Sequence, residues 1–209
     1  MKTPAVFVGR EIEIKTAVAL IRKGKSLVIE GPFGIGKTTF AAKVATSIDG
    51  FLPLYCSFEH DGSKIVEGLN REIIPLYRRN NSKLGKQIHS FHLATQEKRP
   101  LIIVDDIWKV TPQKVAFFKR LNKYGNCQFI LIIETTKDNL RLKVRTIDTN
   151  HEIIKLGKLN DTDSYALFDE LIARSDRTVA QGVKHALVES CNGYPLGIVE
   201  TVRITRGLA

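Results

Sequence analysis

Short apolar runs alternate along this chain with longer segments in which apolar residues recur at every third or fourth position. The apolar runs have the length of buried β-strands, and they lie at 26–30, 51–56, 101–104, 127–133 and, with alternating polarity, 151–156. The periodic segments predict helices, at 14–21, 39–48, 65–74, 84–91 and 112–121. The polar, basic segment 138–148 is assigned no element. Strands that alternate with helices indicate an α/β domain built on a mostly parallel sheet.

The pattern changes after residue 157, where no further strand is predicted. Apolar positions recur at helical spacing around 165–171 and 178–191, and a last helix follows a break at 193–196. We therefore predict a core over residues 1–157 and a small helical lid subdomain over 158–209. A length of 209 residues suits one α/β domain with such an addition.

Prolines sharpen three of these element boundaries. Thr111 and Pro112 are residue types favoured at the N-cap and the first position of a helix, so a helix is predicted to begin there. Pro53 has no backbone N–H to donate, which favours an edge strand or a strand start. Pro75 disfavours helical backbone at the residue before it, so the helix over 65–74 is predicted to end there.

Between the first strand and the second helix, residues 31–38 read GPFGIGKT, which fits the phosphate-binding pattern G-x-x-x-x-G-K-[ST]. Glycines allow positive φ and a close approach of the backbone to phosphate, and the helix N-terminus favours an anion. Lys37 is predicted to reach the β- and γ-phosphates, and the Thr38 hydroxyl to bind Mg²⁺. The motif predicts a P-loop NTPase three-layer sandwich that binds a nucleoside di- or triphosphate with Mg²⁺. Its predicted nucleotide-binding residues are Gly34, Ile35, Gly36, Lys37, Thr38 and Thr39.

Carboxylates follow the strand predicted at 101–104. Asp105 and Asp106 are placed at its carboxyl end, where open α/β sheets bind ligands. Asp105 is predicted to hold Mg²⁺ together with Thr38, and Asp106 to orient or deprotonate an attacking water. The strand over 127–133 also ends in polar residues, and a sensor of the γ-phosphate is predicted there.

Composition excludes several classes of protein. No apolar run approaches the roughly 20 residues of a membrane span, and the N-terminus has no apolar signal region. The three cysteines are widely spaced, which is typical of reduced thiols rather than of a disulfide or zinc framework. We expect a cytoplasmic protein without a membrane partner.

The net charge of +10 leaves two interpretations open: a basic surface that contacts nucleic acid non-specifically, or a solvated surface that happens to be basic. The candidate footprints are two groups of basic residues, one made of Arg78, Arg79, Lys83 and Lys86 and the other of Lys114, Lys119, Arg120 and Lys123. His89 and His92 can share a helix face, but no further ligands are spaced to form a metal site with them.

Several motifs occur in an order that resembles the NB-ARC, or AP-ATPase, branch of the STAND NTPases. They are 8–11 (VGRE), the P-loop, 101–108 (LIIVDDIW), 130–137 (ILIIETTK), 156–168 (LGKLNDTDSYALF) and 191–196 (CNGYPL). The resemblance covers nearly the whole chain, and the D-D-x-W and C-x-G-x-P-L boxes are its specific parts. It implies that the nucleotide is ATP or ADP, and that the protein is a switch that responds to which of the two is bound.

The resemblance also implies roles for individual residues. Val8 and Arg10 would contact the adenine side of the nucleotide, and Pro195 would pack against the base from the helical subdomain. Thr136, with Thr135 beside it, would stand at the γ-phosphate sensor. Lys137 replaces the arginine usual in the family, and a lysine lacks the fork of a guanidinium. The chain also ends soon after the last motif, so we expect either a minimal stand-alone ATPase or a domain that works with separate chains.

Two functions lead. The first is a Mg²⁺-dependent, slowly hydrolysing switch ATPase that self-associates or binds a partner protein. An arginine from a neighbouring molecule would help to stabilise the charge on the phosphates. The candidates are Arg120, Arg141 and Arg145, and for each an internal ion pair is an equal alternative. The second is a DNA-associated AAA+-like ATPase of the replication-initiation or transposition type. A non-catalytic nucleotide-binding module is disfavoured because the lysine, threonine and both aspartates are intact.

Overall fold

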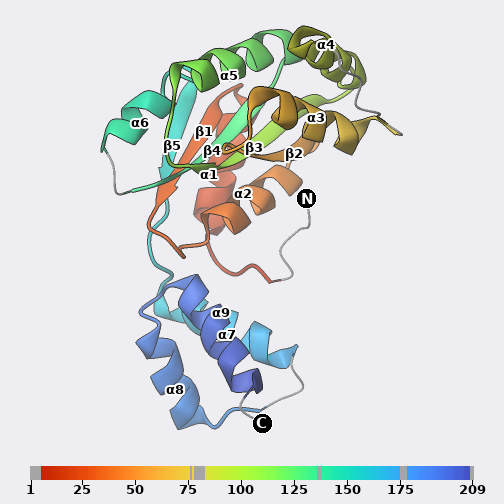
Figure 1. The fold of residues 1–209 in the computed structure, drawn as a ribbon. Helices are drawn as coiled ribbons and strands as arrows, with labels where there is room; N and C mark the ends of the chain where they lie inside the picture. Colours follow the sequence, from red (N-terminus) through yellow and green to blue (C-terminus); the bar gives the residue numbers. More distant parts are fainter. Residues whose placement is uncertain (1–5, 76, 78–82, 136–137, 175–177, 208–209) are drawn as a thin grey trace.

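A computed structural model describes residues 6–75, 77, 83–135, 138–174 and 178–207. Its centre is one five-stranded parallel sheet with helices on both faces, and further helices lie beyond one end of the sheet (Figure 1). The strands are β1 Ser26–Gly31, β2 Phe51–Ser57, β3 Arg99–Ile107, β4 Gln128–Glu134 and β5 His151–Lys155. The helices are α1 Glu11–Arg22, α2 Lys37–Thr46, α3 Gly62–Ile73, α4 Leu84–Ala94, α5 Pro112–Gly125, α6 Asp138–Val144, α7 Asp161–Ala173, α8 Gln181–Ser190 and α9 Pro195–Gly207. The predicted three-layer P-loop NTPase sandwich is confirmed.

The strand order β2-β3-β4-β1-β5 decides which loops meet. Strand β4 lies between β1 and β3, and Gly31 at the end of β1 pairs with Glu134 at the end of β4. On the other side, Ser57 at the end of β2 pairs with Asp105. Because the strands are parallel, their carboxyl ends form one edge, and the P-loop and both aspartates lie along it. Strand β2 is an edge strand, as Pro53 predicted.

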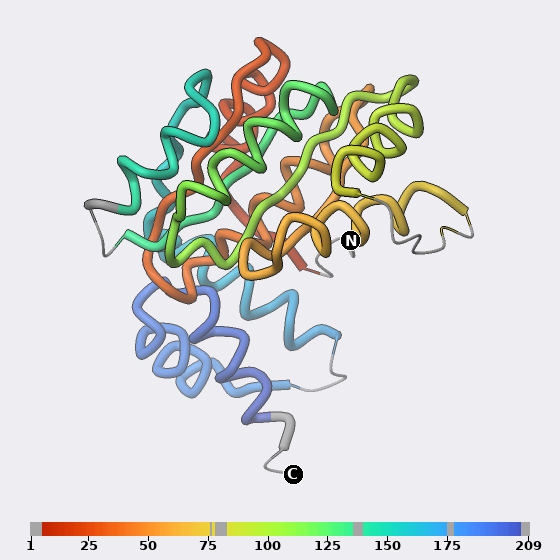
Figure 2. The backbone as a smooth tube through the Cα atoms, turned by 45° about the horizontal axis from the view of Figure 1, so that its top comes forward, coloured from red at the N-terminus to blue at the C-terminus, as the bar shows by residue number. Residues whose placement is uncertain are grey.

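Each face of the sheet has its own hydrophobic core, because alternate side chains of a strand point to opposite faces. Leu101 and Ile103 of β3 join the core under α1 and α2, whereas Ile102 and Val104 join the core under α3, α4, α5 and α6. The tube view shows the latter helices covering the same side of the sheet (Figure 2). Strands β1, β3 and β4 are continuous apolar runs for this reason: they are covered on both faces.

Two element predictions need correction. Residues 138–144 form helix α6, which the sequence left unassigned. Leu140, Val144 and Ile147 are buried at i, i+4 and i+7, and they pack into the core with α5 although polar residues surround them in the sequence. Helix α2 begins at Lys37 rather than Thr39, so the last two P-loop residues belong to its first turn.

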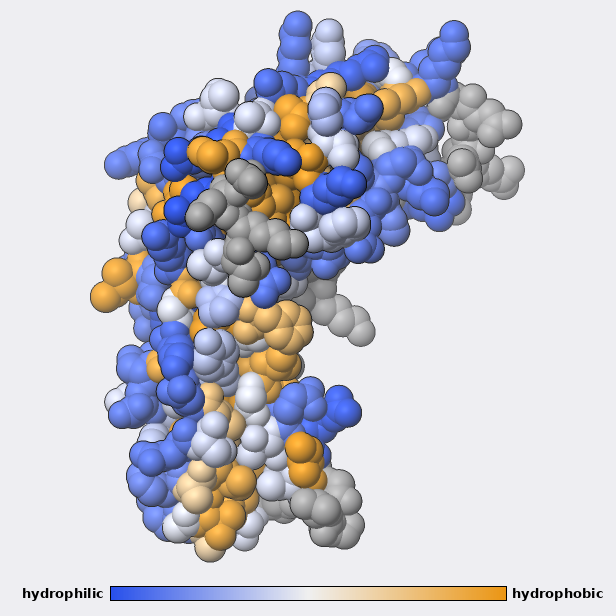
Figure 3. Space-filling view, turned by 60° about the vertical axis from the view of Figure 1, so that its left-hand side comes forward, coloured by the Kyte–Doolittle hydropathy of each residue, from blue (hydrophilic) through white to orange (hydrophobic). Residues whose placement is uncertain are grey.

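The helices α7, α8 and α9 enclose a separate hydrophobic cluster. Phe168, Val188 and Ile198 are buried in it, and Val8 from the N-terminal segment packs against it. Seen from another side, hydrophobic side chains gather in the narrower region between the sheet and these helices (Figure 3). A cluster of their own supports the proposal that residues 158–209 form a helical subdomain. Among the described residues, no helix has the length and apolar character needed to cross a membrane.

The start of α5 gives a small, testable contribution to stability. The Thr111 side chain accepts a hydrogen bond from Lys114 N at 3.4 Å, and Pro112 occupies the first turn, as predicted. We expect Thr111→Ala to lower the free energy of unfolding by about 1 kcal/mol, because one helix-terminal N–H loses its acceptor. Urea denaturation measures this, and Thr111→Ser, which keeps the hydroxyl, is the control. Equal losses in the two variants would contradict the capping role.

Candidate functional site

The P-loop is the turn that joins β1 to α2. Gly34 and Gly36 have φ of 76° and 88°, a left-handed conformation that glycine adopts without strain. Gly36 is the N-cap of α2 and contributes no side chain to the cap. The first backbone N–H groups of α2 therefore point into the turn without a capping acceptor, which is the arrangement that binds phosphate at a helix N-terminus.

Lys37 folds back over this turn. Its ammonium donates hydrogen bonds to the carbonyl oxygens of Gly31, at 2.9 Å, and Pro32, at 2.8 Å. Burial lowers the pKa of Lys37, and the nearby carboxylates of Glu134 and Asp105 oppose that shift. Both acceptors are neutral carbonyls, so a phosphate oxygen can replace them as a stronger, charged partner.

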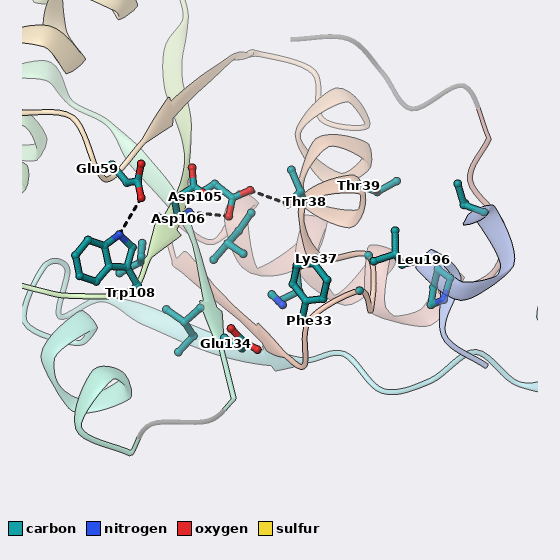
Figure 4. A pocket seen from close by; sticks show the side chains of 17 residues that line it. Phe33, Lys37, Thr38, Thr39, Glu59, Asp105, Asp106, Trp108, Glu134 and Leu196 are labelled. Atoms are coloured by element: carbon teal, nitrogen blue, oxygen red, sulfur yellow. Dashed lines mark hydrogen bonds between the residues drawn. The ribbon is translucent and has the colours of Figure 1, made fainter. Parts of the chain in front are cut away.

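Thr38 and Asp105 come together from α2 and β3. The Thr38 hydroxyl donates to Asp105 Oδ2 at 2.6 Å, and Asp105 Oδ1 accepts from the backbone N–H of Asp106 at 2.8 Å (Figure 4). A hydroxyl beside a carboxylate is a set of hard oxygen ligands that suits Mg²⁺ next to a phosphate. The two residues predicted to hold the metal are thus within hydrogen-bonding distance of each other.

Asp106 has an unusual backbone. Its φ is 59°, in the left-handed region where aspartate and asparagine are the most tolerated residues after glycine. This backbone lies within β3, at the register shift between Val104 and Ile107 in the pairing with β4. It leaves the Asp106 side chain exposed on the border of the cavity, one residue after Asp105.

These groups line a cavity of about 670 Å³ at the carboxyl edge of the sheet. This volume lies in the range of small-molecule sites. Lys37 is its one basic lining residue among those described, whereas four carboxylates line it: Glu59, Asp105, Asp106 and Glu134. An apolar rim faces them and includes Phe33, Trp108, Leu196 and Val199. A polyphosphate would meet an excess of negative charge here, so it needs a cation with it.

Residues 21–140 match the AAA domain family, and they make up more than half of the 209 residues. The chain belongs to this family. It is an AAA-type P-loop NTPase domain. No curated protein sequence matches the chain.

Several solved structures share the fold of this AAA domain. The RuvB Holliday junction branch migration motor of Thermotoga maritima matches with a TM-score of 0.65 at 15% identity, over 100% of this chain and 65% of that one. AMPPCP-bound DnaA from Aquifex aeolicus matches with a TM-score of 0.64 at 16% identity, over 97% and 63%. A Walker-type ATPase of Pyrococcus abyssi matches with a TM-score of 0.66 at 10% identity, over 96% and 68%. This chain thus spans about two thirds of these proteins, and the likeness shows the fold alone.

Trp108 and Glu59 are polar lining residues of the AAA domain's cavity to which the sequence assigned no role. Trp108 Nε1 donates to Glu59 Oε1 at 3.1 Å across the mouth of the cavity (Figure 4). Glu59 comes from the loop after β2, and Trp108 from the turn after β3. The sequence did contain one indication of their position. Strand β2, like β3 and β4, is followed by polar residues, and parallel pairing places the ends of all three strands on one edge of the sheet.

Pro195 lies where α9 begins, against the P-loop. The backbone N–H of Leu196 donates to Gly34 O at 3.1 Å, and the Pro195 ring lies 3.8 Å from the place a Cβ on Gly36 would occupy. Both residues border the cavity. The first turn of α9 therefore contacts the phosphate-binding loop directly, and contact of Pro195 with adenine stays a prediction.

Arg10 holds the P-loop from another side. Its guanidinium donates to Ile35 O at 3.1 Å and Gly157 O at 2.8 Å, and burial lowers its pKa. Neither Arg10 nor Val8 is among the described residues that border the cavity. Their predicted contact with the adenine side remains a prediction, and the observed contacts tie the N-terminal segment to the P-loop.

The predicted sensor lies only in part within the described residues. The backbone N–H of Thr135 donates to Gly31 O at 3.3 Å, next to the P-loop. Thr136 and Lys137 lie outside the described residues.

Some of the basic side chains singled out in the sequence have internal roles. Arg141 donates Nε to Glu30 Oε2 at 2.9 Å, and this pairs the buried Glu30 carboxylate. Lys114 was expected on an exposed basic face, but its ammonium donates to the carbonyls of Phe58 and His60. Both are therefore unsuited to reach a second molecule, whereas Arg120 and Arg145 are exposed.

Proposed function

We propose that this AAA domain is a Mg²⁺-dependent ATPase that passes its nucleotide state to the helices α7–α9. The observation that supports catalysis best is the 2.6 Å contact between Thr38 and Asp105 beside Lys37. An NTP-binding module without catalysis has less need for two successive carboxylates at this edge. The adenine preference rests on the resemblance to NB-ARC proteins.

The chain's own groups divide the work of phosphoryl transfer. Lys37 and the N-terminus of α2 hold the β- and γ-phosphates, and bound Mg²⁺ would neutralise charge on the phosphate oxygens. Thr38 and Asp105 are the residues that would hold it. Asp106 orients the attacking water and accepts its proton. Additional positive charge would come from an arginine of a neighbouring molecule, for which Arg120 and Arg145 are exposed candidates.

The contact of α9 with the P-loop supports a switch of the STAND, NB-ARC type. The backbone N–H of Leu196 donates to Gly34 O, and the Arg10 guanidinium donates to Ile35 O. A phosphate that changes the conformation of the P-loop therefore also changes the contact that positions the start of α9. ATP is then expected to favour self-association or binding of a partner protein, and ADP another state. Light scattering of the purified chain should give a larger mass with Mg²⁺ and a non-hydrolysable ATP analogue than with Mg²⁺ and ADP. Equal masses would contradict the oligomerising switch.

Dependence on Mg²⁺ is the direct test of the metal-binding pair. We expect phosphate release from ATP to stop when EDTA is added and to return when Mg²⁺ is in excess. Thr38→Ala should raise the Mg²⁺ concentration for half-maximal activity about 10- to 100-fold, because the metal loses one oxygen ligand. Thr38→Ser keeps the hydroxyl and should stay close to the native requirement. An unchanged requirement in Thr38→Ala would contradict this role.

A DNA-associated AAA+-like ATPase is the alternative, supported by the net charge of +10 and by the fold shared with the branch migration motor RuvB and with DnaA. Phosphate release is measured with and without double-stranded DNA, at low and moderate salt. Stimulation that fades with salt would favour this alternative, because phosphate contacts are lost as counterions compete. Slow hydrolysis that DNA leaves unchanged favours the switch.

A further inference from the structure

A second polar cavity lies between α4 and α5, far from the nucleotide site. Its volume is about 380 Å³, and it is lined by Gly85, Ile88, His89, His92, Arg120, Lys123 and Tyr124. The last three belong to the final turns of α5, and α5 begins just after the carboxyl edge of the sheet. The cavity is therefore at the opposite end of α5 from Asp105 and Asp106. Helices α4 and α5 lie at the far side of the sheet from α7, α8 and α9 (Figure 1).

Among the described residues, the lining is basic and contains no carboxylate. His89 and His92 are three residues apart on α4, and Arg120 and Lys123 are three residues apart on α5, so each pair shares one helix face. No carboxylate of the described residues makes an ion pair with any of the four. Nitrogen donors from both helices thus converge on one hollow without an internal anion to neutralise them.

The start of α4 adds backbone donors to this hollow. Gly85 lies in the first turn of α4, and a Cβ there would be 2.8 Å from an Arg120 guanidinium nitrogen. Only the missing side chain lets the guanidinium lie this close to the helix start. The N-cap, Lys83, gives no side-chain cap, so the first N–H groups of α4 have no side-chain acceptor.

An aromatic ring completes the border. Tyr124 is 52% exposed, and the Lys123 ammonium lies 5.4 Å from its ring centroid. A phenol offers a hydroxyl donor and a flat face on which a base or sugar can rest. Cations with a solvent-facing aromatic ring are the chemistry that recognises a phosphate attached to a nucleoside.

We propose that the α4–α5 cavity binds a phosphate oxyanion, and that the backbone of a nucleic acid supplies it. Arg120 and Lys123 provide the charge, the imidazoles of His89 and His92 provide further N–H donors, and the first turn of α4 borders the cavity at Gly85. The site does not depend on ATP hydrolysis, because it shares no lining residue with the nucleotide cavity. This inference deepens the DNA-associated alternative proposed above, and it gives Arg120 a role other than that of an arginine supplied to a neighbouring active site. Nucleic-acid affinity and phosphate release test the two proposals separately.

The test compares two double variants that each remove two positive charges. Arg120→Ala with Lys123→Ala removes the cavity's cations, and Lys15→Ala with Arg22→Ala removes two exposed cations of α1 on the other face of the sheet. Fluorescence anisotropy with a short labelled oligonucleotide gives the affinity at several salt concentrations. We expect the cavity variant to bind about 10-fold or more weakly, and its salt dependence to be shallower by about two phosphate contacts. The α1 variant should keep most of the affinity.

Histidine resonances show where the anion binds. The chain has five histidines, and neither His151 on β5 nor His185 on α8 borders either cavity. In the native protein, the oligonucleotide and inorganic pyrophosphate should shift the imidazole signals of His89 and His92 and leave those of His151 and His185 in place. Assignment follows from His89→Gln and His92→Gln.

The outcomes separate the sources of the phosphate. Shifts with both ligands, and competition between them, support the nucleic acid. Shifts with pyrophosphate alone keep the phosphate site and assign it to a free phosphorylated ligand, which overturns the nucleic-acid part. Unmoved His89 and His92 signals, or equal losses of affinity in the two double variants, overturn the site.

Discussion

Lys37→Ala is expected to lower ATP hydrolysis by about 10²- to 10³-fold, the cost of removing one preorganised cation or donor from a transition state. The ammonium already lies in the loop, 2.9 Å from Gly31 O and 2.8 Å from Pro32 O, and it is the one basic group among the described lining residues. Four carboxylates face the same cavity, so loss of Lys37 leaves the phosphates without a basic side chain of this cavity to offset their charge. Phosphate release measures the activity, and a fluorescent ADP analogue measures binding.

Lys43→Ala is the matched control, because Lys43 lies on the same helix and its loss removes the same charge away from the cavity. We expect it to keep nearly full activity. Thermal denaturation of both variants shows whether either has lost its fold. A folded Lys37→Ala protein with native hydrolysis would show that the P-loop of this chain does not act on phosphate.

The main chemical groups could be predicted because their signals are local. A strand, the P-loop motif and a helix follow one another within 26–48, and the sequence of Asp105 and Asp106 after an apolar run places them at a strand end. Parallel pairing then brings these ends together without further information. The fold class follows from the same alternation of strands and helices.

The parts that the sequence did not predict depend on tertiary contacts. The sequence of α6 has apolar residues at helical spacing, Leu140, Val144 and Ile147, but the polar residues between them made the pattern too weak to predict a helix. Only the packing of these residues in the core with α5 shows their role. Lys114 was expected on a solvated face, yet α5 turns it toward the carbonyls after β2. Hydrogen bonds between distant residues, such as Trp108 with Glu59, have no local pattern at all.

The contact between the start of α9 and the P-loop was also predictable only in part. The motif 191–196 predicted that Pro195 lies near the nucleotide, and the structure places it against Gly36. The hydrogen bond from Leu196 N–H to Gly34 O is between backbone atoms, so no residue type in the sequence predicts it. This bond nonetheless joins the P-loop directly to the first turn of α9.

Asp106→Asn is expected to lower kcat by about 10²- to 10⁴-fold while leaving nucleotide affinity near the native value. Asparagine tolerates the left-handed backbone that Asp106 adopts, with φ of 59°, and it has nearly the same size. The hydrogen bond to Asp105 Oδ1 comes from the backbone N–H and is therefore kept. The change removes only the carboxylate that takes the proton of the attacking water. Phosphate release under saturating Mg²⁺ and ATP measures kcat, and ADP-analogue binding measures affinity.

Glu59→Gln is the control that separates the carboxylates of this cavity. The amide oxygen of glutamine can still accept from Trp108 Nε1, so the contact at 3.1 Å survives and only the charge is lost. If Asp106 is the base, Glu59→Gln keeps most of the activity. A large loss in Glu59→Gln with little change in Asp106→Asn would instead assign the base to the loop after β2. Asp106→Ala adds a structural check: alanine at this backbone should cost about 1 kcal/mol of stability that asparagine does not.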